Sequence, residues 1–115
     1  MEFGPVNEQG VVSLFSKIHR HIGFPRIKYI NDFFPDCEAT CDIGAKEHWV
    51  NIEFKYKLRF YINPGDIDKW RTKVDYLVCW EMDNRAMPEK IRPVKIIALK
   101  DCLMDKTVIA NINGE

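Results

Sequence analysis

Hydrophobic side chains recur at helical spacing near the start of the chain. Within residues 7–22, NEQGVVSLFSKIHRHI, they form a single stripe: Val11, Leu14, Phe15, Ile18 and Ile22. Asn7 can cap the first turn, and Gly23 followed by Pro25 is a typical end signal. The pattern therefore predicts a helix over 7–22. One turn further back the stripe reaches Glu8, so we expect this acid to face the sheet near one end.

Most of the remaining hydrophobic residues follow strand patterns. Within residues 49–61 apolar side chains alternate with polar ones, which predicts a strand with one apolar and one polar face. Residues 74–81, VDYLVCWE, form a nearly continuous apolar run, typical of a strand buried on both faces. Three further strands are predicted at 26–31, 35–41 and 92–99.

Turn signals connect these segments into a topology. Gly44 suits a turn, so the strands at 35–41 and 49–61 are predicted to pair as a hairpin. Residues 63–73 open with a turn and are predicted to hold a short helix, whereas 105–115 has no clear pattern. The order of helix, strands, short helix and two strands favours an α/β or α+β sheet with helices packed against it. We expect an α/β fold.

Length, composition and charge narrow the class of protein. The chain has 115 residues, enough for one compact domain, and 46% of them are hydrophobic, which is ordinary for a globular protein. Seventeen basic residues balance seventeen acidic ones, so only a local patch could attract a polyanion. No apolar run approaches the ~20 residues of a membrane span, and the first ten residues lack a signal-peptide pattern. We therefore expect no membrane association and a cytoplasmic location.

Four cysteines raise the question of metal binding. Cys37 and Cys41 together with His48 could belong to a zinc site, although no second close Cys/His pair accompanies them. Cys79 lies inside a strand-like run and is predicted to be a small core residue. The favoured interpretation for all four cysteines, Cys102 included, is structural.

Two acids and a lysine stand out in the predicted hairpin. Pairing of its strands would bring Asp36 to Glu53, and Lys55 leaves the same strand face as Glu53. Two carboxylates held together are costly unless a cation neutralises them. The alternative is a pair of solvated surface acids, which is common on sheets.

The order of these residues resembles a known signature. Pro35-Asp36, a hairpin-length gap and Glu53-Phe54-Lys55 are similar to the motif of the PD-(D/E)XK nuclease superfamily. NEQGVVSLF, FPDCEA, NIEFKYK and VDYLVCWE also resemble segments of its small, mostly uncharacterised bacterial, archaeal and phage members. The resemblance covers 7–99 and implies a restriction-endonuclease-like fold within a single domain, 1–115. That fold has a central mixed β-sheet flanked by helices, in the order helix, three strands, helix, strand.

The resemblance also implies roles for individual residues. Asp36 and Glu53 would ligate Mg²⁺, with Mn²⁺ as a possible substitute, and the backbone carbonyl of Phe54 is a further ligand by analogy. The metal would activate a water for in-line attack on a phosphodiester bond of DNA. Lys55 would orient that water or help to deprotonate it, and would offset charge on the phosphorus. Glu8 would be an accessory acid; the alternative is that it only suits a helix N-terminus.

Basic residues concentrate after the acidic motif. The predicted nucleic-acid contacts are Lys57, Arg59, Lys69, Arg71 and Lys73. A second basic group surrounds the end of the first helix: Lys17, Arg20, Arg26 and Lys28. A chain of this length leaves little room for a recognition domain. We therefore expect a homodimer or a larger assembly. A measurement of the mass in solution at low salt would test this expectation. The motif does not distinguish DNA from RNA, or duplex from branched substrates.

A rival hypothesis uses the same fold without catalysis. The chain could be a nucleic-acid-binding or assembly module built on a nuclease fold, because fold does not fix function. The presence of Asp36, Glu53 and Lys55 together favours the enzyme, since a decayed site would have lost one of them. His19 and His21 are better explained by the end of the helix than by catalysis.

Overall fold

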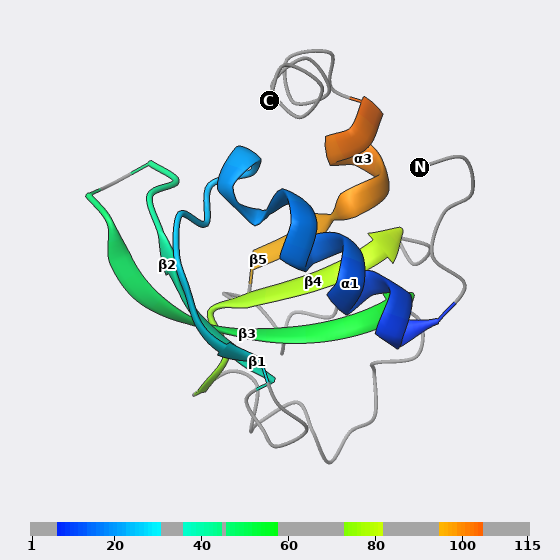
Figure 1. Cartoon of the computed structure of the whole chain (residues 1–115), viewed down its shortest axis with the longest axis horizontal. Coiled ribbons are helices and arrows are strands. Elements are labelled where there is room, and N and C mark those ends of the chain that lie inside the picture. The colour runs from blue at the N-terminus through cyan, green and yellow to red at the C-terminus, as the bar shows by residue number, and fades with distance from the viewer. Residues whose placement is uncertain (1–6, 31–35, 45, 58–72, 82–94, 105–115) are drawn as a thin grey trace.

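The structure is a sheet of five strands with helices packed on it (Figure 1). It is a computed structural model and describes residues 7–30, 36–44, 46–57, 73–81 and 95–104. The helices are α1 (Glu8–Ile18), a short 3₁₀ turn η1 (His19–His21) and α3 (Leu99–Met104). The strands are β1 (Ile27–Ile30), β2 (Cys37–Cys41), β3 (His48–Lys57), β4 (Tyr76–Glu81) and β5 (Lys95–Ala98).

The strands lie in the sheet in the order in which they occur along the chain. β1, β2 and β3 pair antiparallel, whereas β4 runs parallel to β3 and β5 runs parallel to β4. The register of β1 against β2 shifts between Ile27 and Tyr29, as in a β-bulge. The sheet is therefore mixed, and the predicted α/β class is confirmed.

The helix α1 begins where the sequence predicts and ends earlier. Asn7 caps it, with its side-chain Oδ1 accepting a hydrogen bond from the backbone N–H of Gly10 at 2.9 Å. The α-helix stops at Ile18 instead of continuing to residue 22, and η1 leads into Gly23, which has a φ of 101°. The backbone N–H of Phe24 donates to the carbonyl of His19 at 2.9 Å, which folds the chain back toward β1. The Gly23 end signal is confirmed, one 3₁₀ turn after the α-helix.

The core lies between α1 and the sheet. Four residues of the predicted stripe are buried there: Val11, Leu14, Phe15 and Ile18. Phe15 makes edge-on ring contacts with Phe24 and Phe54, with centroids 5.4 and 5.2 Å apart. The apolar side chains of β3 at positions 50, 52 and 54 join this core, which places the alternate positions on the opposite face of the sheet.

The strand β4 is buried on both faces, as its sequence predicts. Tyr76, Leu77, Val78 and Cys79 are all buried. The predicted strand over 92–99 needs a correction at its last residue. The sequence predicts that Leu99 ends this strand, but Leu99 begins α3 and packs into the core.

Parts of the predicted secondary structure lie outside the described residues. These parts are most of the short helix within 63–73, the ends of the predicted strands at 58–61 and 92–94, and the segment 105–115. Among the helices that the structure describes, none has the length and hydrophobicity that crossing a membrane requires.

Candidate active site

The hairpin of β2 and β3 brings Asp36 and Glu53 together. Cys37 lies opposite Ile52 in the register, so Asp36, one residue earlier, comes to Glu53. The backbone N–H of Asp36 donates to Glu53 Oε1 at 3.2 Å, and the backbone N–H of Phe54 donates to Asp36 Oδ2 at 3.0 Å. Each carboxylate is thus held by the other strand's backbone, and the predicted meeting of the two acids is confirmed.

Alternation along the strands explains why these acids share a face. Cys37 and Ala39 of β2 point into the core with Ile52 and Phe54 of β3. The polar positions between them, Glu53 included, therefore leave the sheet on the side opposite α1. The apolar residues of the hairpin fix the register, and the register fixes the pairing of the acids.

Glu53 is buried although it lies on the polar side of β3. Only 8% of the residue is exposed, so the alternative of two solvated surface acids does not hold for it. Burial raises the pKa of Glu53 to about 8, and the charge of Asp36 and a side-chain hydrogen bond to it act in the same direction. The backbone N–H of Asp36 and the charge of Lys55 lower that pKa in part. Without a cation at the site, the acid pair holds a proton near neutral pH.

Lys55 is a described cation whose charge acts on this pair. It follows Glu53 by two residues on β3, so both side chains leave the same face of the strand, and it is half-buried. Its charge favours the ionised forms of both Glu53 and Glu8. The sequence prediction that Lys55 stands beside the two acids is supported by these effects.

Glu8 comes to the same region from another element. It lies in the first turn of α1. Figure 1 shows that this end of the helix lies beside the carboxyl end of β3. Its side chain is exposed, whereas the sequence predicts that it faces the sheet. Partial desolvation raises its pKa, the charge of Lys55 lowers it, and the charge of Asp36 raises it. Glu8 is therefore close enough for the charges of Asp36 and Lys55 to act on it, but its side chain is not packed between α1 and the sheet.

The donor set of the pair fits a hard divalent cation. Two carboxylates and the adjacent backbone carbonyl of Phe54 are the oxygen ligands that Mg²⁺ prefers. A divalent charge would also favour the ionised form of Glu53, against the burial and the charge of Asp36 that raise its pKa. Among the side chains that the structure describes, no group of three or more His, Cys, Asp or Glu residues is gathered closely enough to hold a metal. Waters and main-chain oxygens would have to complete the coordination around Asp36 and Glu53.

The predicted basic patch is only partly within the described residues. Lys73 is exposed, and Lys57 is the last residue of β3. Arg59, Lys69 and Arg71 lie outside the described residues. In the second basic group, Arg26 pairs with Glu47 at 3.1 Å and Lys28 pairs with Glu38 at 3.0 Å, which reduces their net charge.

The cysteines have a structural explanation. Cys37, Cys41 and Cys79 are buried and, within the described part of the chain, are not in disulfides; the prediction that Cys79 belongs to the core is confirmed. Burial raises the pKa of Cys37 to about 12, with further contributions from the charges of Asp36 and Glu38.

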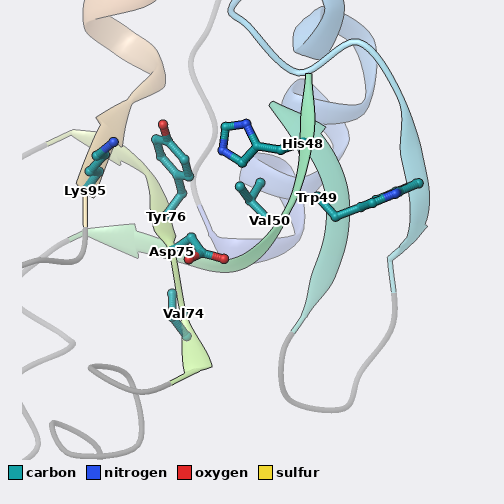
Figure 2. Close-up of a pocket in the computed structure, with 7 residues that line it drawn as sticks. All are labelled: His48, Trp49, Val50, Val74, Asp75, Tyr76 and Lys95. Atoms are coloured by element: carbon teal, nitrogen blue, oxygen red, sulfur yellow. The ribbon is translucent and has the colours of Figure 1, made fainter. Parts of the chain in front are cut away.

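A cavity of about 200 Å³ lies at the other end of β3 (Figure 2). It is lined by His48, Trp49, Val50, Val74, Asp75, Tyr76 and Lys95. The Nζ atom of Lys95 lies 5.6 Å from the centroid of the Tyr76 ring, and Asp75 Oδ2 accepts from the backbone N–H of Asn51 at 2.8 Å. The sequence gives no signal for this cavity, because three strands that are distant in the chain form it.

Comparison with known proteins gives no relative for this chain. No protein-family model matches it, and neither the curated proteins nor the solved structures contain a match. Function is therefore inferred from the geometry of the site itself.

Proposed function

We propose that the protein is a metal-dependent nuclease that hydrolyses phosphodiester bonds of DNA with a PD-(D/E)XK type of site. The observation that carries the proposal is the acid pair of Asp36 and Glu53, each bonded to the opposite strand of one hairpin. Lys55 follows on the same strand face, at the spacing that the motif requires. Burying a carboxylate beside a second one costs stability, which is a cost typical of functional sites.

The order of the described elements supports a restriction-endonuclease-like fold. A helix precedes three antiparallel strands, and the next described strand, β4, returns parallel to the third. Parallel pairing of β3 and β4 requires a crossover connection between them, which agrees with the helix predicted within 63–73.

Each residue of the site has a task in this proposal. Asp36, Glu53 and the Phe54 carbonyl would hold Mg²⁺, which when bound supplies charge neutralisation and an acidified water. Lys55 would donate hydrogen bonds to a phosphate oxygen or to the attacking water. Glu8, exposed at the rim, would be placed to accept a proton or to bind the metal through water.

The test is a cleavage panel of linear, supercoiled, branched and single-stranded DNA and of RNA, with Mg²⁺ or Mn²⁺. We expect the wild type to cut at least one of the DNA substrates in the panel. Asp36→Ala, Glu53→Ala and Lys55→Ala should each lose about a hundredfold or more in rate, because each removes a group that acts on the reacting phosphate. Circular dichroism would show that the variants are folded.

Glu38→Gln is the matched control. Glu38 lies on β2 two residues from Asp36, and its carboxylate pairs with Lys28 instead of with Glu53. We expect this variant to cut within a few-fold of the wild type. Unchanged cutting by the Asp36 and Glu53 variants would refute the assignment. No cutting by the wild type, together with binding of a nucleic acid, would favour the non-catalytic binding module.

A further inference from the structure

Trp49 is an exposed aromatic residue on the strand that carries the site. It is 55% exposed, and among the described large hydrophobic residues only Ile43 and Met104 are also exposed. The residue contributes to the lining of the cavity, and Figure 2 shows its indole extending away from Tyr76 and Lys95. The Nζ atom of Lys28 lies 5.8 Å from the centre of the indole ring, within cation–π distance.

Alternation places Trp49 on the same face of the sheet as the candidate site. Val50 belongs to the core, so alternation along β3 puts Trp49, like Glu53 and Lys55, on the opposite face of the sheet. Figure 2 shows the side chains of His48 and Trp49 extending in opposite directions. Glu53 follows Trp49 by four positions, which is about 13 Å along a strand. That distance equals about four stacked nucleotides of one nucleic-acid strand at ~3.4 Å each, and fewer when the strand is extended.

An exposed indole beside a cation suits a flat ligand that carries a negative charge close by. A nucleobase offers a π-face and is attached to a phosphate, and stacking on an aromatic side chain is tolerant of sequence. Bases inside a duplex already stack on each other, so an exposed side chain can stack only on an unpaired base. Because Glu38 pairs with Lys28, the ring and not the cation would supply most of the attraction.

We propose that Trp49 is a stacking platform for an unpaired base of the substrate strand. The nucleic-acid strand would run along β3 from Trp49 to the acid pair. The substrate would therefore have a single-stranded segment within a few nucleotides of the cleaved bond. This inference rests on the proposed nuclease function and specifies the class of its substrate.

The test is a fluorescence titration with single-stranded DNA, duplex DNA of the same sequence and single-stranded RNA, without divalent metal. We expect single-stranded nucleic acid to quench the indole emission of the wild type, and the quench to be lost in Trp49→Phe, which keeps the other two tryptophans of the chain. Trp49→Ala should bind about 5- to 140-fold more weakly, since stacking contributes ~1–3 kcal/mol per base and ~1.4 kcal/mol is tenfold. Duplex DNA should bind the wild type and this variant alike.

Met104→Ala is the control, because it removes an exposed apolar side chain from α3 and should leave binding unchanged. Equal binding of single strands by the wild type and Trp49→Ala would overturn the inference. So would a concentration-dependent change in Trp49 emission without nucleic acid, which would mean that a second copy covers the ring. Comparison of DNA with RNA identifies the source of the unpaired base.

The two proposals fail in different ways. Normal cleavage of single strands by Trp49→Ala, with unchanged KM, would overturn the stacking role and leave the nuclease intact. Quenching through Trp49 without cleavage of any panel member would refute the nuclease and leave a single-strand-binding surface.

Discussion

Glu53 has the most strongly shifted pKa among the described Asp and Glu residues. Its burial and the charge of Asp36 favour the protonated form, so its pKa is raised from the ordinary value of 4.5 to about 8. The sequence indicates that position 53 is polar and that Asp36 comes to it. It does not indicate burial, because alternation assigns a face and says nothing of what covers that face.

This perturbation predicts a pH-dependent stability. A carboxyl with a raised pKa in the folded state contributes stability below its unfolded pKa, and this contribution is lost as the pH rises through the folded pKa. The unfolding free energy of the wild type should therefore fall relative to Glu53→Gln between pH ~5 and pH ~8, by up to a few kcal/mol. Urea unfolding at a series of pH values, in a buffer with chelator, measures the difference.

Glu38→Gln again serves as the comparison, because Glu38 has a cation partner. Its stability should follow the wild-type pH profile. Parallel profiles for the wild type and Glu53→Gln would mean that Glu53 is ionised in the folded protein at neutral pH.

At the scale of the elements, two glycine turns set the ends of segments that carry the site. Gly23 closes α1 and η1 with a φ of 101°, and its carbonyl accepts from the backbone N–H of Asp42 at 3.0 Å. Gly44 lies in the turn of the β2–β3 hairpin with a φ of 67°. Both positions have the left-handed conformation that glycine adopts without a steric penalty.

The two glycines should respond differently to alanine. A Cβ at Gly23 would lie 2.3 Å from Cγ1 of Ile43, whereas a Cβ at Gly44 would meet nothing within 4 Å. Gly44→Ala should cost only the backbone penalty of about 1–2 kcal/mol, and Gly23→Ala should cost more because Ile43 must also move. Thermal unfolding of both variants measures the two losses of stability. Equal losses would show that the Ile43 side chain moves aside without destabilising the fold.

The sequence predicts most of these elements because each has a local cause. The stripe of α1, its Asn7 cap and the alternation of β3 act within a few residues. The early end of the α-helix and the start of α3 at Leu99 depend on tertiary contacts. The carbonyl of Gly23 accepts from the backbone N–H of Asp42, which is distant in the chain, and Leu99 packs into the core formed by α1 and the earlier strands.

At the scale of the whole molecule, the sequence predicts the pairing of the strands in the sheet only in part. The β2–β3 hairpin, and with it the pairing of Asp36 and Glu53, follows from a short connection. The parallel pairing of β3 with β4 joins Ile52 to Tyr76, and the cavity at Tyr76 and Lys95 depends on that pairing. Local patterns do not specify such distant partners, so the sequence indicates the acid site and misses the cavity.

A bound metal should stabilise the whole molecule, since a ligand that binds only the folded state raises its stability. At pH ~8, Mg²⁺ should raise the unfolding temperature of the wild type by a few °C, and less at pH ~6, where Glu53 keeps its proton. Asp36→Asn and Glu53→Gln should lose the effect, while Glu38→Gln should keep it. Equal stabilisation of all four proteins would place the metal elsewhere, whatever the result of the cleavage panel.

The strand β1 has a consequence for how the protein meets other chains. It stands at one end of the described strand order, is four residues long, carries the exposed Lys28 and shifts register against β2. Short, irregular and charged edges are poor templates for adding a further strand, which limits edge-to-edge aggregation. A partner that reaches the Trp49 side of the sheet is therefore expected to bind through side chains and not by extending the sheet.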